Sequence, residues 1–113
     1  MTALLTITAN ADDVGMWLTV EGELDLLSSR TLEDRLDELH ARRTPTVLDL
    51  RRLRFIDSTG VRLLIKTCTA ARVERWPLKL FAPTGYARRV FEVTGIARAL
   101  PLIGWPRDSS RAG

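Results

Sequence analysis

The stretch that decides the fold is residues 46–64, TVLDLRRLRFIDSTGVRLL. An apolar run at 46–50 leads into a polar link, and apolar residues then recur with helical spacing from Val61, which predicts a strand, a loop and a helix. Ser58 falls at or beside the first position of that helix. A helix N-terminus presents unpaired N–H groups and a partial positive charge, so a hydroxyl there is a cap or an acceptor for a phosphoryl group. From spacing alone, the cap is the simpler interpretation.

The flanking sequence extends this pattern in both directions. Residues 4–22 alternate around turn-forming residues at 10–15, which predicts a hairpin, and Ser28 or Ser29 can cap a following helix. After the central helix, which Pro77 stops, come a strand at 78–81, a short helix with Gly95 as its C′ residue, and a short edge strand near 99–103. The apolar stripe predicted for the central helix comprises Val61, Leu64, Ile65, Cys68 and Ala71.

This order predicts an α/β fold, a single domain with a mixed four- to five-stranded sheet. The opening hairpin is antiparallel, and helical crossovers make the later neighbours parallel. The loops at 24–25, 57–58 and 83–84 then leave the carboxyl ends of strands, where sheets of this type gather functional loops.

The composition favours a single globular domain over a membrane protein or a nucleic-acid-binding protein. The chain has 113 residues, 45% hydrophobic and 27% charged, which suits one globular domain. No apolar run approaches a membrane span, the N-terminus does not read as a signal peptide, and the single cysteine excludes an internal disulfide, so we expect a cytoplasmic domain without membrane insertion. The net charge of +3 is too small, and the aromatic residues too scattered, to favour direct nucleic-acid binding.

Three arginines directly precede the Asp57-Ser58 pair: Arg51, Arg52 and Arg54. They form either a solvated loop or a charged surface that steers an acidic partner toward Ser58.

The sequence predicts no catalytic site, metal or cofactor. His40 is the only histidine, Cys68 is expected in the core, and no glycine-rich phosphate loop occurs. Asp25, Asp49 and Asp57 could gather at one sheet edge as a metal site, but Asp49 lies inside a strand.

Four blocks together resemble the STAS domain of bacterial anti-sigma factor antagonists: residues 22–25 (GELD), 47–50 (VLDL), 55–61 (FIDSTGV) and 89–96 (RVFEVTGI). The resemblance covers about residues 3–104 and implies that the single domain over 1–113 is STAS-like, with its core in that range. The polar, proline-interrupted end predicts a frayed tail at 105–113. The chain departs from the family before the fourth strand, where relatives often carry Gly-Gly and this chain has RWP at 75–77.

The resemblance also implies a function. Such proteins bind an anti-sigma factor with serine kinase activity, release the sigma factor for transcription, and dissociate when the kinase phosphorylates the serine matching Ser58; a serine phosphatase resets them. Thr59 is the fallback acceptor, and the implied partner-binding residues are Asp25, Asp57, Ser58, Thr59, Gly60 and Arg62. Gly60 would avoid crowding a partner or the adjacent loop, or supply a special backbone angle. The alternatives are an accessory subunit of a membrane transport ATPase complex and a nucleotide-binding module near Asp25 and Ser58.

Overall fold

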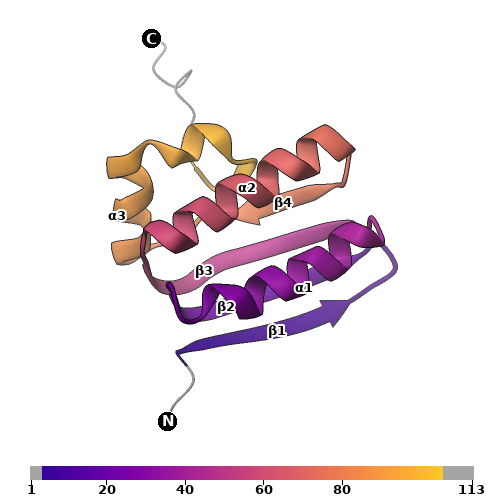
Figure 1. The fold of residues 1–113 in the computed structure, drawn as a ribbon, viewed down its shortest axis with the longest axis horizontal. Helices are drawn as coiled ribbons and strands as arrows, with labels where there is room; N and C mark the ends of the chain where they lie inside the picture. Colours follow the sequence, from indigo (N-terminus) through magenta and orange to yellow (C-terminus); the bar gives the residue numbers. More distant parts are fainter. Residues whose placement is uncertain (1–3, 106–113) are drawn as a thin grey trace.

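The computed structural model describes residues 4–105, which form one five-stranded sheet with helices packed on it (Figure 1). In chain order the elements are β1 (Leu5–Ala11), β2 (Met16–Leu24), α1 (Ser29–Ala41), β3 (Thr46–Ile56), α2 (Ser58–Glu74), β4 (Leu78–Phe81), α3 (Gly85–Thr94), the 3-10 helix η1 (Ile96–Ala99) and β5 (Leu102–Ile103). Of the tail predicted at 105–113, residues 106–113 lie outside the described residues.

The strands lie in the order β1-β2-β3-β4-β5. β1 is antiparallel to β2, and each later pair of neighbours is parallel. The prediction of a mixed sheet with an antiparallel opening hairpin is therefore confirmed. Because β2, β3 and β4 run the same way, the loops that follow them meet at one edge of the sheet.

The core lies between the sheet and the two long helices, which run side by side across it in Figure 1. Alternate residues of β2 and β3 face the helices because strand side chains alternate between the two sides. Among the most deeply buried side chains on these elements are Leu18, Val20, Leu24, Leu48, Leu50, Leu32, Leu36 and Leu64.

Strand β3 is longer than the sequence predicts. The expected strand ended at residue 50 because three arginines follow, but the structure continues it to Ile56. Leu53 and Ile56 are 2% and 1% exposed, so the arginine segment still has one apolar face. β2 pairs with this extension of β3 and continues as far as Leu24. The register between the two strands shifts just after Gly22, whose φ is +110°. The loop interpretation of the three arginines is thus wrong, since all of them belong to a strand.

The buried face of α2 differs in part from the predicted stripe. Leu64, Cys68 and Ala71 are buried as expected, whereas Ile65 is 38% exposed and Leu63 is buried. Leu63 and Ile65 lie on opposite sides of the buried row formed by Leu64, Cys68 and Ala71. Only the side that carries Leu63 is covered by the rest of the protein. Burial of Cys68 raises the pKa of its thiol to about 12, which fits a core residue rather than a nucleophile.

Candidate functional site

The predicted site lies where β3 ends and α2 begins. Asp57 is the N-cap of α2: its Oδ1 accepts hydrogen bonds from the backbone N–H groups of Thr59 at 2.9 Å and Gly60 at 3.0 Å. Ser58 is the first residue of the helix. The capping function therefore belongs to Asp57, and the simple interpretation of Ser58 as the cap is wrong.

Asp57 also joins two loops. Its Oδ2 accepts a hydrogen bond from the backbone N–H of Leu26 at 3.1 Å, and its own N–H donates to the carbonyl of Leu24 at 3.2 Å. The loop between β2 and α1 is thereby held beside Ser58. A carboxylate with three N–H donors is a fixed part of the scaffold rather than a free base.

Asp25 shapes the same loop. Its Oδ1 accepts from the backbone N–H groups of Leu27 and Ser28, both at 3.0 Å. The hydroxyl of Ser28 accepts from the Asp25 N–H and donates to the carbonyl of Glu23 at 2.6 Å. Ser28 is the N-cap residue of α1 by position, but its side chain makes no cap hydrogen bond because it is used in this loop.

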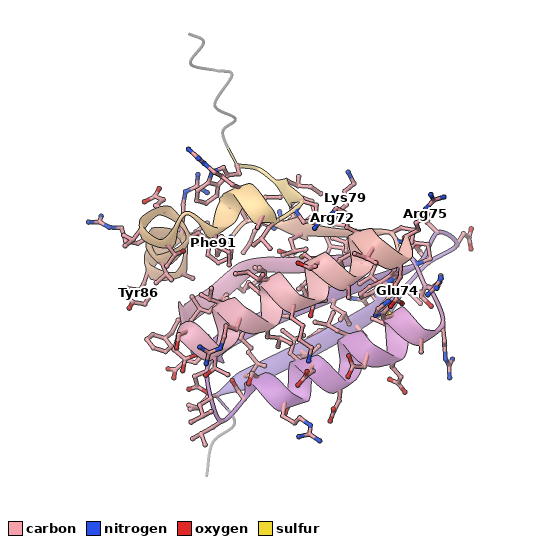
Figure 2. All side chains as sticks on the ribbon, turned by 45° about the horizontal axis from the view of Figure 1, so that its top comes forward. Arg72, Glu74, Arg75, Lys79, Tyr86 and Phe91 are labelled. Carbon is pink, nitrogen blue, oxygen red and sulfur yellow. The ribbon has the colours of Figure 1, made fainter. Side chains whose placement is uncertain are left out.

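This loop exposes two large apolar side chains. Leu26 and Leu27 are 72% and 81% exposed, although leucine pairs usually enter a core. Phe55 at the end of β3 stacks on Tyr86 of α3, with ring centroids 5.5 Å apart. Tyr86, labelled in Figure 2, is 56% exposed. Sequence reasoning missed these residues, and the only signal available was a leucine pair inside a polar loop.

Within residues 4–105 the Ser58 hydroxyl finds no hydrogen-bond partner, and the side chain is exposed. Thr59 and Arg62 line a groove of about 440 Å³ between the beginnings of α1 and α2. The groove also contains Ile65 and an ion pair between Lys66 and Glu33, which lowers the pKa of the Glu33 carboxyl.

Gly60 is buried, and a Cβ there would lie 2.7 Å from the carbonyl oxygen of Leu24 and 2.7 Å from Cγ1 of Ile56. Its φ is not in the left-handed region, so the special backbone angle proposed from sequence is not the reason for glycine. Contact with the adjacent strand end is the reason, because α2 approaches the sheet closely at this point.

Asp49 does not join the other two aspartates. Its carboxylate is held by Arg51, with Nε 2.9 Å from Oδ1 and Nη2 2.7 Å from Oδ2, and these contacts lower the pKa of the Asp49 carboxyl. The Arg51 guanidinium also lies 4.4 Å from the centroid of the Phe81 ring. All three arginines are exposed, but within residues 4–105 only Arg51 forms an ion pair, which leaves Arg52 and Arg54 as the members of the cluster without one.

No group of three potential metal ligands forms within residues 4–105. His40 lies near the end of α1, stacked on Trp76 with ring centroids 4.8 Å apart, whereas Ser58 begins α2. The helices of the described segment include none long and apolar enough to cross a membrane.

The comparisons with known proteins agree with this architecture. The family model described as Mlab, STAS domain, matches residues 7–104, so the chain belongs to the STAS domain family. An anti-sigma factor antagonist from Mycobacterium paratuberculosis is 25% identical with a TM-score of 0.73, the match covering 96% of this chain and 92% of that one. Comparison with curated proteins gives no match.

Two solved structures of SpoIIAA share the fold at lower identity. The unphosphorylated form of this anti-sigma factor antagonist is 17% identical with a TM-score of 0.70, covering 96% of this chain and 98% of that one. The phosphorylated form, from Bacillus, is 16% identical with a TM-score of 0.66, covering 95% and 97%. The α/β fold inferred from the four sequence blocks is confirmed.

Proposed function

We propose that this protein is an anti-sigma factor antagonist: it binds an anti-sigma factor that has serine kinase activity, and phosphorylation of Ser58 ends the binding. The observation that carries the proposal is the position of Ser58. It is exposed at the first residue of α2, and Asp57 performs the capping that would otherwise explain a serine there. The protein acts in the cytoplasm as a regulator rather than an enzyme, and a serine phosphatase restores it.

The comparisons support this assignment. The relative from Mycobacterium paratuberculosis is described as an anti-sigma factor antagonist, and SpoIIAA has been solved in unphosphorylated and phosphorylated forms. The existence of both forms of SpoIIAA, a protein of the same fold, supports the view that this fold accommodates phosphorylation. In this chain Thr59 is the alternative acceptor, but it is only partly exposed and lines the groove.

The surface around Ser58 suits a protein partner. Leu26, Leu27 and Tyr86 supply exposed apolar area, and Arg62, one turn along α2, supplies a cation beside the groove. Exposed apolar patches mark interaction sites, and tyrosine and arginine are enriched among the residues that dominate the energies of protein interfaces. In this proposal Asp25, Asp57 and Gly60 act by holding the surface in shape, and Ser58, Thr59 and Arg62 contact the partner.

Phosphorylation changes this surface without disturbing the fold. A phosphoserine carries about −1.5 to −2 charges and is favoured at a helix N-terminus. The carboxylate of Asp57 already occupies the first N–H groups of α2, so the phosphate extends outward, toward the partner and toward Arg62. An unfavourable contribution of about 3 kcal/mol at the interface weakens binding more than a hundredfold, which is sufficient for a switch.

The test is co-purification of tagged protein from its host, comparing wild type with Ser58→Ala and Ser58→Asp. We expect a kinase-domain partner with wild type and Ser58→Ala, no partner with Ser58→Asp, and an added phosphate mapped to residue 58 in wild type only. Thr69→Asp is the matched control, because Thr69 is an exposed residue of α2 remote from its N-terminus.

Three results would contradict the proposal. Recovery of the partner with Ser58→Asp would remove the switch, and phosphate on Thr59 in Ser58→Ala would move the acceptor by one residue. Recovery of a transport ATPase with all variants would identify the accessory-subunit alternative. A purified protein that binds nucleotide, with loss of binding in Ser58→Asp, would favour the nucleotide-binding module.

A further inference from the structure

A second concave surface lies at the other end of the sheet from Ser58. It has a volume of about 630 Å³ and wraps around the amino ends of β2, β3 and β4 and the last turn of α2. This volume is within the range of small-ligand sites, roughly 300–1,000 Å³. We call it the basic-end groove; its lining residues include Met16, Trp17, Val47, Arg72, Arg75, Trp76 and Lys79.

The register of the sheet builds one wall of this groove. Trp17 pairs with Val47, and Val47 pairs with Lys79, so the three side chains form a row across three adjacent strands. Trp76 supplies a second aromatic residue. The indole N–H of Trp17 donates to Asp49 at 3.3 Å, and that of Trp76 donates to the carbonyl of Thr44 at 2.6 Å. Both polar atoms are satisfied inside the protein. Trp76 is 3% exposed and its ring is stacked on His40, so the half-buried Trp17 supplies the aromatic surface that a ligand can reach.

Three cations border the groove: Arg72 and Arg75 at the end of α2, and Lys79 in β4 (Figure 2). All three are exposed, and within residues 4–105 none of them forms an ion pair with a carboxylate. The one carboxylate in the lining, Asp12, does not pair with these cations. It accepts hydrogen bonds from the backbone N–H groups of Val14 and Gly15 instead. The groove is therefore apolar inside and positive at its border.

Arg75 carries an independent sign of function. It is the C-cap of α2 with φ 58° and ψ 38°, a left-handed conformation that glycine adopts at little cost and other residues adopt only with strain. The chain thus keeps an arginine at a position where glycine would be less strained, and this arginine lines the groove. A strained residue in a cleft is a reason to look for a ligand.

We propose that the basic-end groove binds a single amphipathic anion: a small molecule with an aromatic or aliphatic body and a carboxylate, sulfonate or phosphate group. The body contacts Trp17 and Val47, and the anionic group contacts Arg72, Arg75 and Lys79. The concave shape favours one molecule over a flat lipid surface, and the unpaired cations favour an anion over a neutral compound.

The test uses two fluorescent probes of nearly equal shape, 1-anilinonaphthalene-8-sulfonate and the uncharged N-phenyl-1-naphthylamine. We expect the sulfonate to bind with 1:1 stoichiometry, to shift the indole N–H resonances of Trp17 and Trp76 in NMR spectra, and to bind about tenfold tighter than the neutral probe. Arg75→Gly should weaken sulfonate binding about fivefold, the effect of one partly desolvated ion contact, and leave the neutral probe unchanged.

The same variant separates binding from folding, because glycine relieves the left-handed strain and should raise Tm by about a few degrees. Arg35→Gln is the matched control, since it removes one positive charge from an exposed position on α1 outside the groove. Equal affinity for both probes, equal weakening by Arg35→Gln, unshifted indole resonances, or binding only to phosphatidylglycerol vesicles and not to the monomeric probe would each overturn the proposal.

Discussion

Replacing Asp57 with alanine removes the acceptor of three backbone N–H groups, those of Leu26, Thr59 and Gly60. Loss of an N-cap costs about 0.5–2 kcal/mol. The additional loss of a charged acceptor for the Leu26 N–H adds about 1 kcal/mol. We therefore expect Asp57→Ala to lower the free energy of unfolding by about 1.5–3 kcal/mol, which corresponds to a fall in Tm of about 6–12 °C for a domain of this size.

Ser58→Ala is the matched comparison, because an exposed residue without an internal hydrogen bond should change the free energy of unfolding by less than about 0.5 kcal/mol. Asp57→Asn keeps one side-chain oxygen for the cap and should fall between the two variants. The assay is equilibrium unfolding in urea followed by tryptophan fluorescence, with the slope unchanged between variants. Equal destabilisation by Asp57→Ala and Ser58→Ala would refute the assignment of the cap to Asp57, and with it the argument that Ser58 is free for phosphorylation.

Four further outcomes follow from the structure. Gly60→Val should destabilise the fold by at least about 2 kcal/mol, because its Cβ would overlap a backbone oxygen, and a variant with wild-type Tm would contradict this. Cys68 should be inert to a thiol reagent at pH 8 until the protein is denatured, since its pKa is raised to about 12. Because the pKa of Asp49 is lowered below 3.8, its contribution to stability is present above that pH and lost as pH falls further; Asp49→Asn should therefore show a smaller loss of Tm between about pH 4 and pH 2. Replacing Arg52 and Arg54 with Gln should slow association with an acidic partner at low salt in stopped-flow measurements, and an unchanged rate would exclude steering.

The parts of the fold that depend on local pattern are predicted from the sequence. The hairpin, the helices and the parallel strands follow from periodicity and from turn residues such as Gly95, which is the left-handed C-cap of α3 as expected. The length of β3 could not be predicted, because its continuation past Arg51 depends on the parallel extension of β2 through Gly22. Strand pairing of this kind is a tertiary interaction that the local sequence does not encode.

Part of the candidate site can likewise be predicted from local sequence, and part of it cannot. Asp57 and Ser58 are found from sequence because helix capping acts over two or three residues. The hydrogen bond from Leu26 to Asp57 joins residues 31 positions apart, so neither the fixed loop nor its exposed leucines could be predicted. The basic-end groove escaped sequence analysis entirely, because its wall brings together Trp17, Val47 and Lys79 from three different strands.

Helix α2 connects the two ends of the molecule, with Ser58 at its first residue and Arg75 just past its last. Its 17 residues span roughly 25 Å, about three times the Debye length of roughly 8 Å at physiological salt. A charge added at one end is therefore almost entirely screened at the other. Coupling between the two ends would therefore require a displacement of the whole of α2 against the sheet. The close approach of Gly60 to Leu24 leaves little room for such a displacement. If both proposed surfaces bind their ligands, we therefore expect binding at one end of α2 to leave affinity at the other end unchanged.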